Sequence, residues 1–372
     1  MNSRAQGADL DLLYSDVEDA LRESVRALLS SRCTAQQVTT VYDGGGPGGR
    51  LWRSLAVDLE LAGLLVPEEH GGAGASAREA AVVLEELGRF VAPVPFLTSS
   101  VISVSAALAA GDGTVTARLA SGEWTGALAV PLTTGPASFT PAVRVDADGT
   151  LRGRVAVVAG AIEADVLLVP AATAAGTELH LVMADDPGIR ITPVVSLDMT
   201  RQVADLELSG AASRRLLDSS TGETAVRGAL RLGAALLASE QVGVADSCLQ
   251  LTVDYLRQRR QFGRVVAGFQ AVKHRLADLW AQVESARAVA RYAAAAAGDP
   301  DLPVAASLAQ AYCSEVAVLA AEECVQLHGG IGMTWEYPAH LYLKRAKADQ
   351  LALGNAAAHL THLAELVNLP SG

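Results

Sequence analysis

The chain has 372 residues, of which half are hydrophobic and 19% are charged, so we exclude an intrinsically disordered protein. Lysine and arginine number 29 against 41 acidic residues, and the resulting net charge of −12 argues against nucleic acid as the main partner. At about 100–200 residues per domain, this length predicts two or three domains.

The cysteines and the N-terminal residues indicate the cellular compartment in which the protein is expected. The four cysteines show no paired spacing and no CxxC motif, so we expect no disulfide framework and no metal site. The N-terminus lacks the apolar stretch of a signal peptide. Residues 90–111 carry no charge and are long enough to span a bilayer, but Pro93, Pro95 and five serine or threonine residues interrupt them. We therefore expect a cytoplasmic protein with no membrane span.

The N-terminal third has helical periodicity. Apolar residues recur at three- and four-residue steps from Val17 to Leu29 and again from Ala81 to Gly88. Between these stretches, the glycines and proline of residues 63–74 predict a tight loop.

The middle third has the pattern of a sheet. Short β-branched runs at 154–158, 166–169 and 179–182 are separated by turn residues such as Asp-Gly and Pro-Gly. This pattern predicts several antiparallel strands that form a small barrel or sandwich.

The last third is helical again. Four long helices are predicted, with short glycine-containing links between them, at 224–258, 269–297, 303–327 and 338–367. Long helices with short links are typical of an antiparallel four-helix bundle. The predicted class is therefore α+β, with an N-terminal helical domain (1–122), a central β domain (123–218) and a C-terminal bundle (219–372).

Two junctions of the bundle could bind a ligand. The first, residues 257–263, places three arginines at a helix end, where they could either be solvated beside the negative end of the helix dipole or clamp a phosphate. The second, Gln326–Met333, contains three glycines that would let a ligand approach the backbone closely. Taken alone, neither junction decides between a structural and a binding role.

Together, these junctions resemble the paired signature of the acyl-CoA dehydrogenase family, carried here by Arg257–Gln270 and Gln326–Pro338. The loop Val66–Gly74 resembles that family as well, and so does the pair Ala277-Asp278 in the second bundle helix. The resemblance covers nearly the whole chain and implies subunits that pair so that FAD lies at their interface. It implies that the FAD diphosphate and adenosine contact Arg259, Phe262 and Gln270. It also implies that the neighbouring subunit's cofactor is lined by Gln326, Leu327, His328, Gly329 and Gly330.

The reaction implied by the resemblance is dehydrogenation of an acyl-CoA thioester to the 2,3-enoyl form. This reaction needs a carboxylate that removes the α-proton while a hydride passes to the flavin. Most family members carry this glutamate in the loop of the last helix, where this chain has Leu353. Another branch carries it early in the first bundle helix, where this chain has Gly233. Both usual positions therefore lack a base.

A third candidate for the base is Glu240. It lies two helical turns beyond Gly233 and interrupts an apolar stripe, so we expect burial to raise its pKa toward that of a useful base. Its sequence context resembles an actinobacterial subfamily of heteromeric dehydrogenases that act on sterol side-chain thioesters. The alternative is a structural glutamate that is paired with a bundle neighbour or with an arginine at a subunit interface.

The middle domain departs from the family pattern on the flavin-ring side. The first strand–loop is Ala129–Gly135, and Val157 and Ala159 stand where side chains would contact the ring.

One hypothesis is an FAD-dependent acyl-CoA dehydrogenase with Glu240 as base, in a homo- or hetero-oligomer that passes electrons to an electron-transferring flavoprotein. The alternative is a non-catalytic or half-site subunit that completes the FAD site of a paralogous partner. A third is a diverged flavoprotein that reacts with oxygen or with a non-CoA substrate. The missing ring contacts are explained either by a heteromer whose partner supplies them or by relaxed flavin binding in a homomer, and we favour the heteromer.

Overall fold

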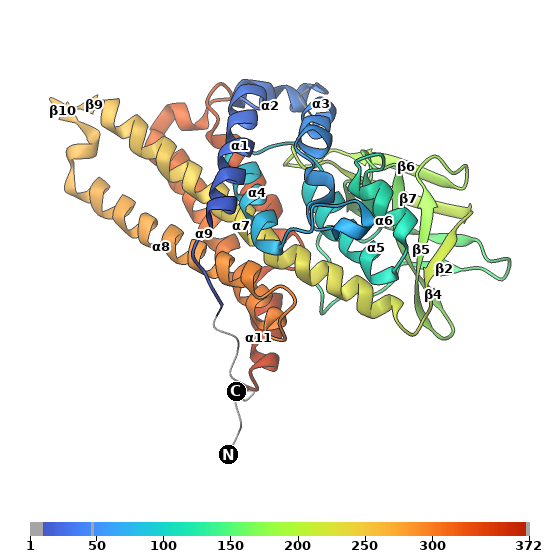
Figure 1. The fold of residues 1–372 in the computed structure, drawn as a ribbon. Helices are drawn as coiled ribbons and strands as arrows, with labels where there is room; N and C mark the ends of the chain where they lie inside the picture. The colour runs from blue at the N-terminus through green and yellow to red at the C-terminus, as the bar shows by residue number, and fades with distance from the viewer. Residues whose placement is uncertain (1–9, 46–47, 370–372) are drawn as a thin grey trace, which may run out of the picture.

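A computed structural model describes residues 10–45 and 48–369. Figure 1 shows N-terminal helices packed beside a long helix, α7, that runs from the β sheet at one end of the molecule to a projecting tip at the other. The predicted order of helices, sheet and helical bundle is confirmed. The domain limits at 122 and 218 stay predictions. The last N-terminal helix ends at Ala120, and the strands of the sheet run from Gly126 to Leu217.

Side-chain caps begin the longest helices of the N-terminal region. Ser15 and Glu18 form a reciprocal capping box at the start of α1, and Ser76 and Glu79 do the same for α4. The α-helices of this region are α1 (Asp16–Arg32), α2 (Ala35–Thr39), α3 (Gly48–Arg53), α4 (Ala77–Arg89), α5 (Val104–Ala110) and α6 (Gly113–Ala120).

The uncharged stretch 90–111 lies inside the protein. It forms a π-helical segment, η5 (Phe96–Ser103), whose eight residues are all buried, followed by α5. Within the described ranges, the helical stretch Leu302–Met333 is long and apolar enough to cross a membrane, but 72% of its most apolar window is buried in the bundle. The apolar character of both stretches is explained by packing in the core.

The central strands form an open, mostly antiparallel sheet in the order β6-β7-β3-β2-β4-β5-β8. The strands are β1 (Gly126–Leu128), β2 (Val143–Val145), β3 (Leu151–Ala159), β4 (Val166–Thr173), β5 (Gly176–Met183), β6 (Ile189–Val194), β7 (Val203–Ala211) and β8 (Arg214–Leu217). Two pairings are parallel, because β1 and β2 both lie along β4. The two end strands, β6 and β8, do not pair with each other in the described part of the chain, so the sheet is open and, of the two predicted forms, agrees with the sandwich rather than the barrel.

The bundle departs from prediction in its last helix. Its elements are α7 (Gly222–Gln258), the hairpin β9 (Arg260–Gln261) and β10 (Arg264–Val265), α8 (Gln270–Ala295), α9 (Leu302–His328), α10 (Ala339–Leu351) and α11 (Ala356–Leu366). The predicted fourth helix, 338–367, is wrong as one element, because Leu353 and Gly354 adopt positive φ of 56° and 99° and divide it into α10 and α11.

Helices α4 and α7 cross at two glycines. A Cβ atom at Gly88 would overlap the backbone of Glu240, and one at Gly243 would overlap the backbone of Glu85. Only glycine permits this close approach of two helix backbones. The crossing buries the middle of α7, including Glu240.

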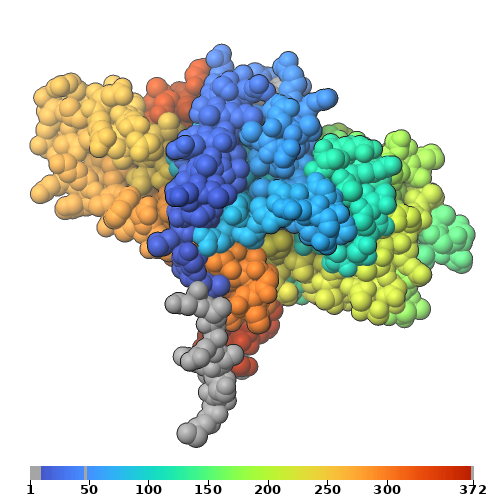
Figure 2. All heavy atoms as spheres, in the orientation of Figure 1, coloured from blue at the N-terminus to red at the C-terminus, as the bar shows by residue number. Residues whose placement is uncertain are grey.

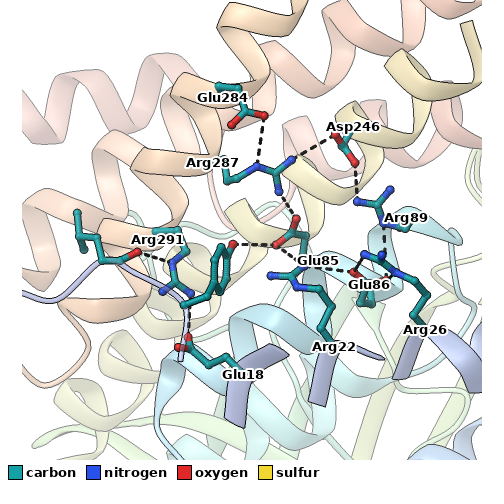
Figure 3. Close-up of polar contacts among 12 residues, drawn as sticks. Glu18, Arg22, Arg26, Glu85, Glu86, Arg89, Asp246, Glu284, Arg287 and Arg291 are labelled. Atoms are coloured by element: carbon teal, nitrogen blue, oxygen red, sulfur yellow. Dashed lines mark hydrogen bonds and ion pairs between the residues drawn. The ribbon is translucent and has the colours of Figure 1, made fainter. Parts of the chain in front are cut away.

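An ionic latch joins α1, α4 and α8 beside this crossing (Figure 3). We define it as the following residues: Glu18, Arg22, Arg26, Arg78, Glu85, Glu86, Arg89, Asp246, Arg287 and Arg291. Glu86 is fully buried and lies 2.6 Å from Arg26 and 3.2 Å from Arg22. Glu18 accepts hydrogen bonds from Arg78 and from Arg291 on α8, each at 2.8 Å. The latch therefore holds the N-terminal helices against the bundle.

Candidate active site and cofactor site

The two usual positions for the base lie side by side. A Cβ atom on Gly233 of α7 would be 2.8 Å from Ile102 Cγ1 and 3.2 Å from Leu353 Cδ1. Aliphatic carbon therefore fills the space where either glutamate of the family would project. The adjoining cavity has about 30 Å³, room for one or two water molecules, and none of its lining residues is titratable.

The loop at the usual base position and the strand–loop on the flavin-ring side contact each other directly. The N–H of Leu353 donates to the carbonyl of Leu132 at 2.7 Å, and the N–H of Leu132 donates to the carbonyl of Val157 at 2.9 Å. An aromatic ring needs about 3.5 Å of contact distance on each face, so it would require roughly 7 Å between these segments. An isoalloxazine ring therefore does not fit between the Leu353 loop and the strand–loop at Leu132. We call this region the closed ring site.

Glu240 faces two arginines and lies outside the cavity at Gly233. Its side chain is 2% exposed and lies 2.6 Å from Arg201 Nη2 and 2.5 Å from Arg345 Nη1. Arg345 comes from α10, and Arg201 comes from the β domain just before β7. Glu240 therefore joins the β domain to two helices of the bundle, α7 and α10.

Two further carboxylates complete this buried charge cluster. Asp198 lies 2.8 Å from Arg345, and Asp349 lies 3.3 Å from Arg201. All five charged side chains are buried. Three carboxyl groups thus share two guanidinium groups, and Asp349 has the longest contact.

The direction of the pKa of Glu240 corrects the sequence-based expectation. Burial raises this pKa, but Arg201 and Arg345, which contact the carboxylate directly, lower it by more. The pKa of Glu240 therefore lies below its ordinary value. The opposite holds for Asp349, whose pKa is raised well above its ordinary value by burial and by the charge of Glu240. The two arginines therefore favour the ionised form of Glu240, whereas burial and the neighbouring charge of Glu240 favour the protonated form of Asp349.

The two glycine-containing junctions meet at the other end of the bundle. The ring of His328, at the end of α9, stacks on Tyr255 in the last turn of α7 with 4.4 Å between centroids. His328 is buried, and its ring nitrogens lie 2.6 Å from the carbonyl of Cys324 and 2.6 Å from the hydroxyl of Tyr337. Its role in the structure is to join α7 and α9, so it supports the neighbouring loop.

Most of the other predicted cofactor residues are exposed, and the segment between α7 and α8, which carries Arg259 and Phe262, forms a projecting end of the molecule (Figure 1 and Figure 2). Arg259 and Gln270 are exposed, and Phe262 is 92% exposed. No atom lies within 4 Å of a Cβ placed on Gly329 or Gly330. Gln326 is exposed beside them, and Leu327 is half-buried. An exposed guanidinium and an accessible glycine backbone are both groups that fit the diphosphate side of FAD. We call this region the cofactor end.

The charged partners of Glu240 were not predicted from the sequence. Arg345 and Asp349 stand four residues apart on α10, so a helical projection could have placed them on one face. Arg201 gave no such signal, because its position against α7 depends on how the β domain packs on the bundle.

Comparison with known proteins agrees with this architecture. Residues 15–120 match the family model of the acyl-CoA dehydrogenase N-terminal domain, and residues 220–367 match that of the C-terminal domain. The chain is 34% identical to acyl-CoA dehydrogenase IpdE2 of Mycolicibacterium smegmatis over 94% of its own length and 98% of the relative's.

Solved structures show the same fold. The ChsE4-ChsE5 complex of Mycobacterium tuberculosis contains a chain that matches with a TM-score of 0.87 and 28% identity, covering 98% of this chain and 100% of the other. The Tcur3481-Tcur3483 steroid acyl-CoA dehydrogenase variant matches with a TM-score of 0.84 and 32% identity, covering 95% and 98%. The resemblance to this family and its actinobacterial subfamily is confirmed, and the chain belongs to the acyl-CoA dehydrogenase family.

Proposed function

We propose that this chain is the half-site subunit of a heteromeric, FAD-dependent acyl-CoA dehydrogenase. The observation that carries the proposal is the direct hydrogen bond from Leu353 to Leu132, beside a cavity with no titratable side chain. This arrangement leaves no space for an isoalloxazine ring between the Leu353 and Leu132 loops, and neither usual position carries a base, which supports a subunit that relies on its partner for both.

The cofactor end supports a role in the partner's site. Arg259, Gln270 and the Gly329-Gly330 backbone are accessible to a ligand outside the chain. These groups would bind the FAD diphosphate and adenosine, while the paralogous partner supplies the ring contacts, the acyl pocket and the base. When bound, FAD would accept the hydride removed from the thioester.

The role of Glu240 as the α-proton base stays a prediction, and the contacts of its side chain favour the alternative. A base must reach the substrate α-carbon with a pKa near the working pH. Glu240 instead contacts two guanidinium groups that lower its pKa. We propose that it is a structural charge.

The substrate and the electron acceptor are proposed from relatives and family. One matched structure is described as a steroid acyl-CoA dehydrogenase, and another is a complex of two named chains. We propose an acyl-CoA thioester with a bulky, sterol-derived acyl group, α,β-dehydrogenation by the heteromer in the cytoplasm, and an electron-transferring flavoprotein as acceptor.

Flavin content tests the proposal. We would measure the visible absorbance of the chain purified alone and of the chain co-expressed with a paralogue whose ring-binding loops and base are present. We expect a colourless lone chain and a coloured complex that a sterol-derived acyl-CoA bleaches. One flavin per lone chain, bleached by acyl-CoA, would overturn the half-site assignment.

A further inference from the structure

The loop that closes the ring site adopts an unfavourable backbone conformation. Leu353 has a φ of 56°, in the left-handed region that a side chain branched at Cγ rarely occupies. Its side chain is buried against Gly233 and Ile102. Such a conformation persists only where the surroundings determine it from several directions.

A buried carboxamide on α9 holds the backbone on both sides of Leu353. Gln310 Nε2 donates to the carbonyls of Ala352 at 2.8 Å and Asp349 at 3.0 Å, and it lies 3.4 Å from the carbonyl of Gly354. Gln310 is fully buried. Because α10 ends at Leu351, these carbonyls lie at or beyond its C-terminal end, where helical partners run out.

A second carboxamide fixes the orientation of the first. Gln241 Nε2 donates to Gln310 Oε1 at 3.0 Å, so the Gln310 amide nitrogen must face the loop. Gln241 is also fully buried and directly follows Glu240 on α7.

The remaining polar groups of Leu353 are held as well. Its N–H donates to the carbonyl of Leu132, and its own carbonyl lies 2.9 Å from His359 Nε2 on α11. Leu353 is therefore fixed at both of its peptide groups, while Gln310 fixes the carbonyls that precede and follow it.

We propose that Gln310 is the positioning residue that sets the Leu353 loop in the conformation that closes the ring site. The contact between the Leu353 loop and Leu132 then depends on a specific amide on α9. This inference rests on the proposed half-site function, because only that function gives the closure a purpose. The alternative is that Gln310 merely packs α9 against α10.

Amide hydrogen exchange of the full chain distinguishes a positioning role of Gln310 from a packing role. Gln310→Met keeps the length of the side chain and removes its donors. We expect the Leu353 amide to exchange roughly tenfold faster or more, because the loop no longer presents it to Leu132, while amides in the middle of α9 are unchanged. Gln350→Met on α10 is the matched control, since Gln350 pairs with Glu315 at the surface.

An unchanged exchange rate at Leu353 in the folded Gln310→Met variant would overturn the inference. So would an equal increase along α7 and α9, which is the pattern of a packing role. If Gln310→Met does not fold, Gln241→Met is used, because it leaves Gln310 in place without its orienting partner. A smaller increase at Leu353 is then expected, and no increase refutes the proposal. The measurement needs neither flavin nor partner, so a failure of the half-site function would be seen separately.

Discussion

At the scale of single residues, Glu240 shows how a buried carboxylate can be misjudged from sequence. The apolar stripe around it correctly indicates burial, and burial alone raises a carboxyl pKa. The sign of the net shift depends on Arg201 and Arg345, which arrive from other parts of the chain. Burial was predictable from helical spacing, whereas the charge partners were not.

Replacing Glu240 should affect stability more than catalysis. Glu240→Gln removes the charge that faces two buried guanidinium groups, so we expect a loss of about 3–5 kcal/mol in the free energy of unfolding. Turnover per flavin of the heteromer should stay within about twofold. Urea unfolding and steady-state kinetics measure the two effects.

The control is Glu322→Gln, whose solvated pair with Lys347 should contribute about 0–1 kcal/mol. A drop in turnover of about 10²–10⁴-fold in folded Glu240→Gln would instead identify Glu240 as the base.

Asp349 should give the stability a distinct pH dependence. Burial and the charge of Glu240 raise its pKa, so the folded chain holds a proton that the unfolded chain loses near pH 3.8. Its contribution is fully present below that pH and is lost as pH rises toward the folded pKa. The Asp349→Asn variant has no carboxyl group to ionise at this position. Its free energy of unfolding relative to wild type should therefore increase as pH rises above about 4. Urea unfolding across this range tests it.

Asp278→Asn on the exposed face of α8 is the matched control for this series. A stability difference between Asp349→Asn and wild type that does not change with pH would mean that Asp349 is ionised in the folded chain.

At the scale of elements, local sequence patterns predicted which helices and strands form better than they predicted where these elements break and how they pair. Helical spacing and glycine-containing links indicated α1, α4, α7, α8 and α9. The break in the predicted fourth helix was not predicted from the sequence. Leu353 is held in its left-handed conformation by contacts from α9 and the β domain, which are distant in the chain. The parallel pairing of β1 and β2 with β4 was missed for the same reason, since strand order is set by chain-distant contacts.

The ionic latch should control how firmly α1 is attached. Glu86→Gln weakens contacts with Arg22, Arg26 and Arg89, and we expect a loss of about 2–4 kcal/mol after allowing for the solvated parts of the arginines. Amide exchange in α1 should accelerate, while exchange in β4 stays the same. Hydrogen-exchange mass spectrometry measures both.

Glu23→Gln, on the exposed face of α1, should leave this exchange unchanged. Equal acceleration in α1 and in the sheet after Glu86→Gln would show that the latch supports the whole fold rather than one attachment.

At the scale of the whole molecule, the closed ring site and the cofactor end lie at different places along α7. Arg259 follows Gly233 by 26 residues, which corresponds to about 39 Å along a continuous helix. The sequence resemblance predicted both sites, because their motifs are local. That one is closed and the other open depends on packing, which only the structure describes.

The cofactor end should determine flavin retention by the heteromer without affecting this chain's own fold. Arg259→Gln removes an exposed charge, so the thermal midpoint of the lone chain should be unchanged. The affinity of the complex for FAD should fall about 10- to 100-fold, as expected for a lost charge-assisted hydrogen bond to a diphosphate. Flavin fluorescence during dilution measures this affinity.

Arg154→Gln, on the exposed surface of the β domain, serves as the comparison. Unchanged flavin affinity in Arg259→Gln would remove the cofactor end from the proposed function.

The length of α7 also bears on how such a chain can evolve. Substitutions separated by much more than about 10 Å and without shared partners combine additively, so changes near Gly233 carry no penalty at Arg259. After a gene duplication, one copy could therefore lose its ring site while the other lost its cofactor end. Each copy would then depend on the other for a complete enzyme, and neither loss would have required a change of fold.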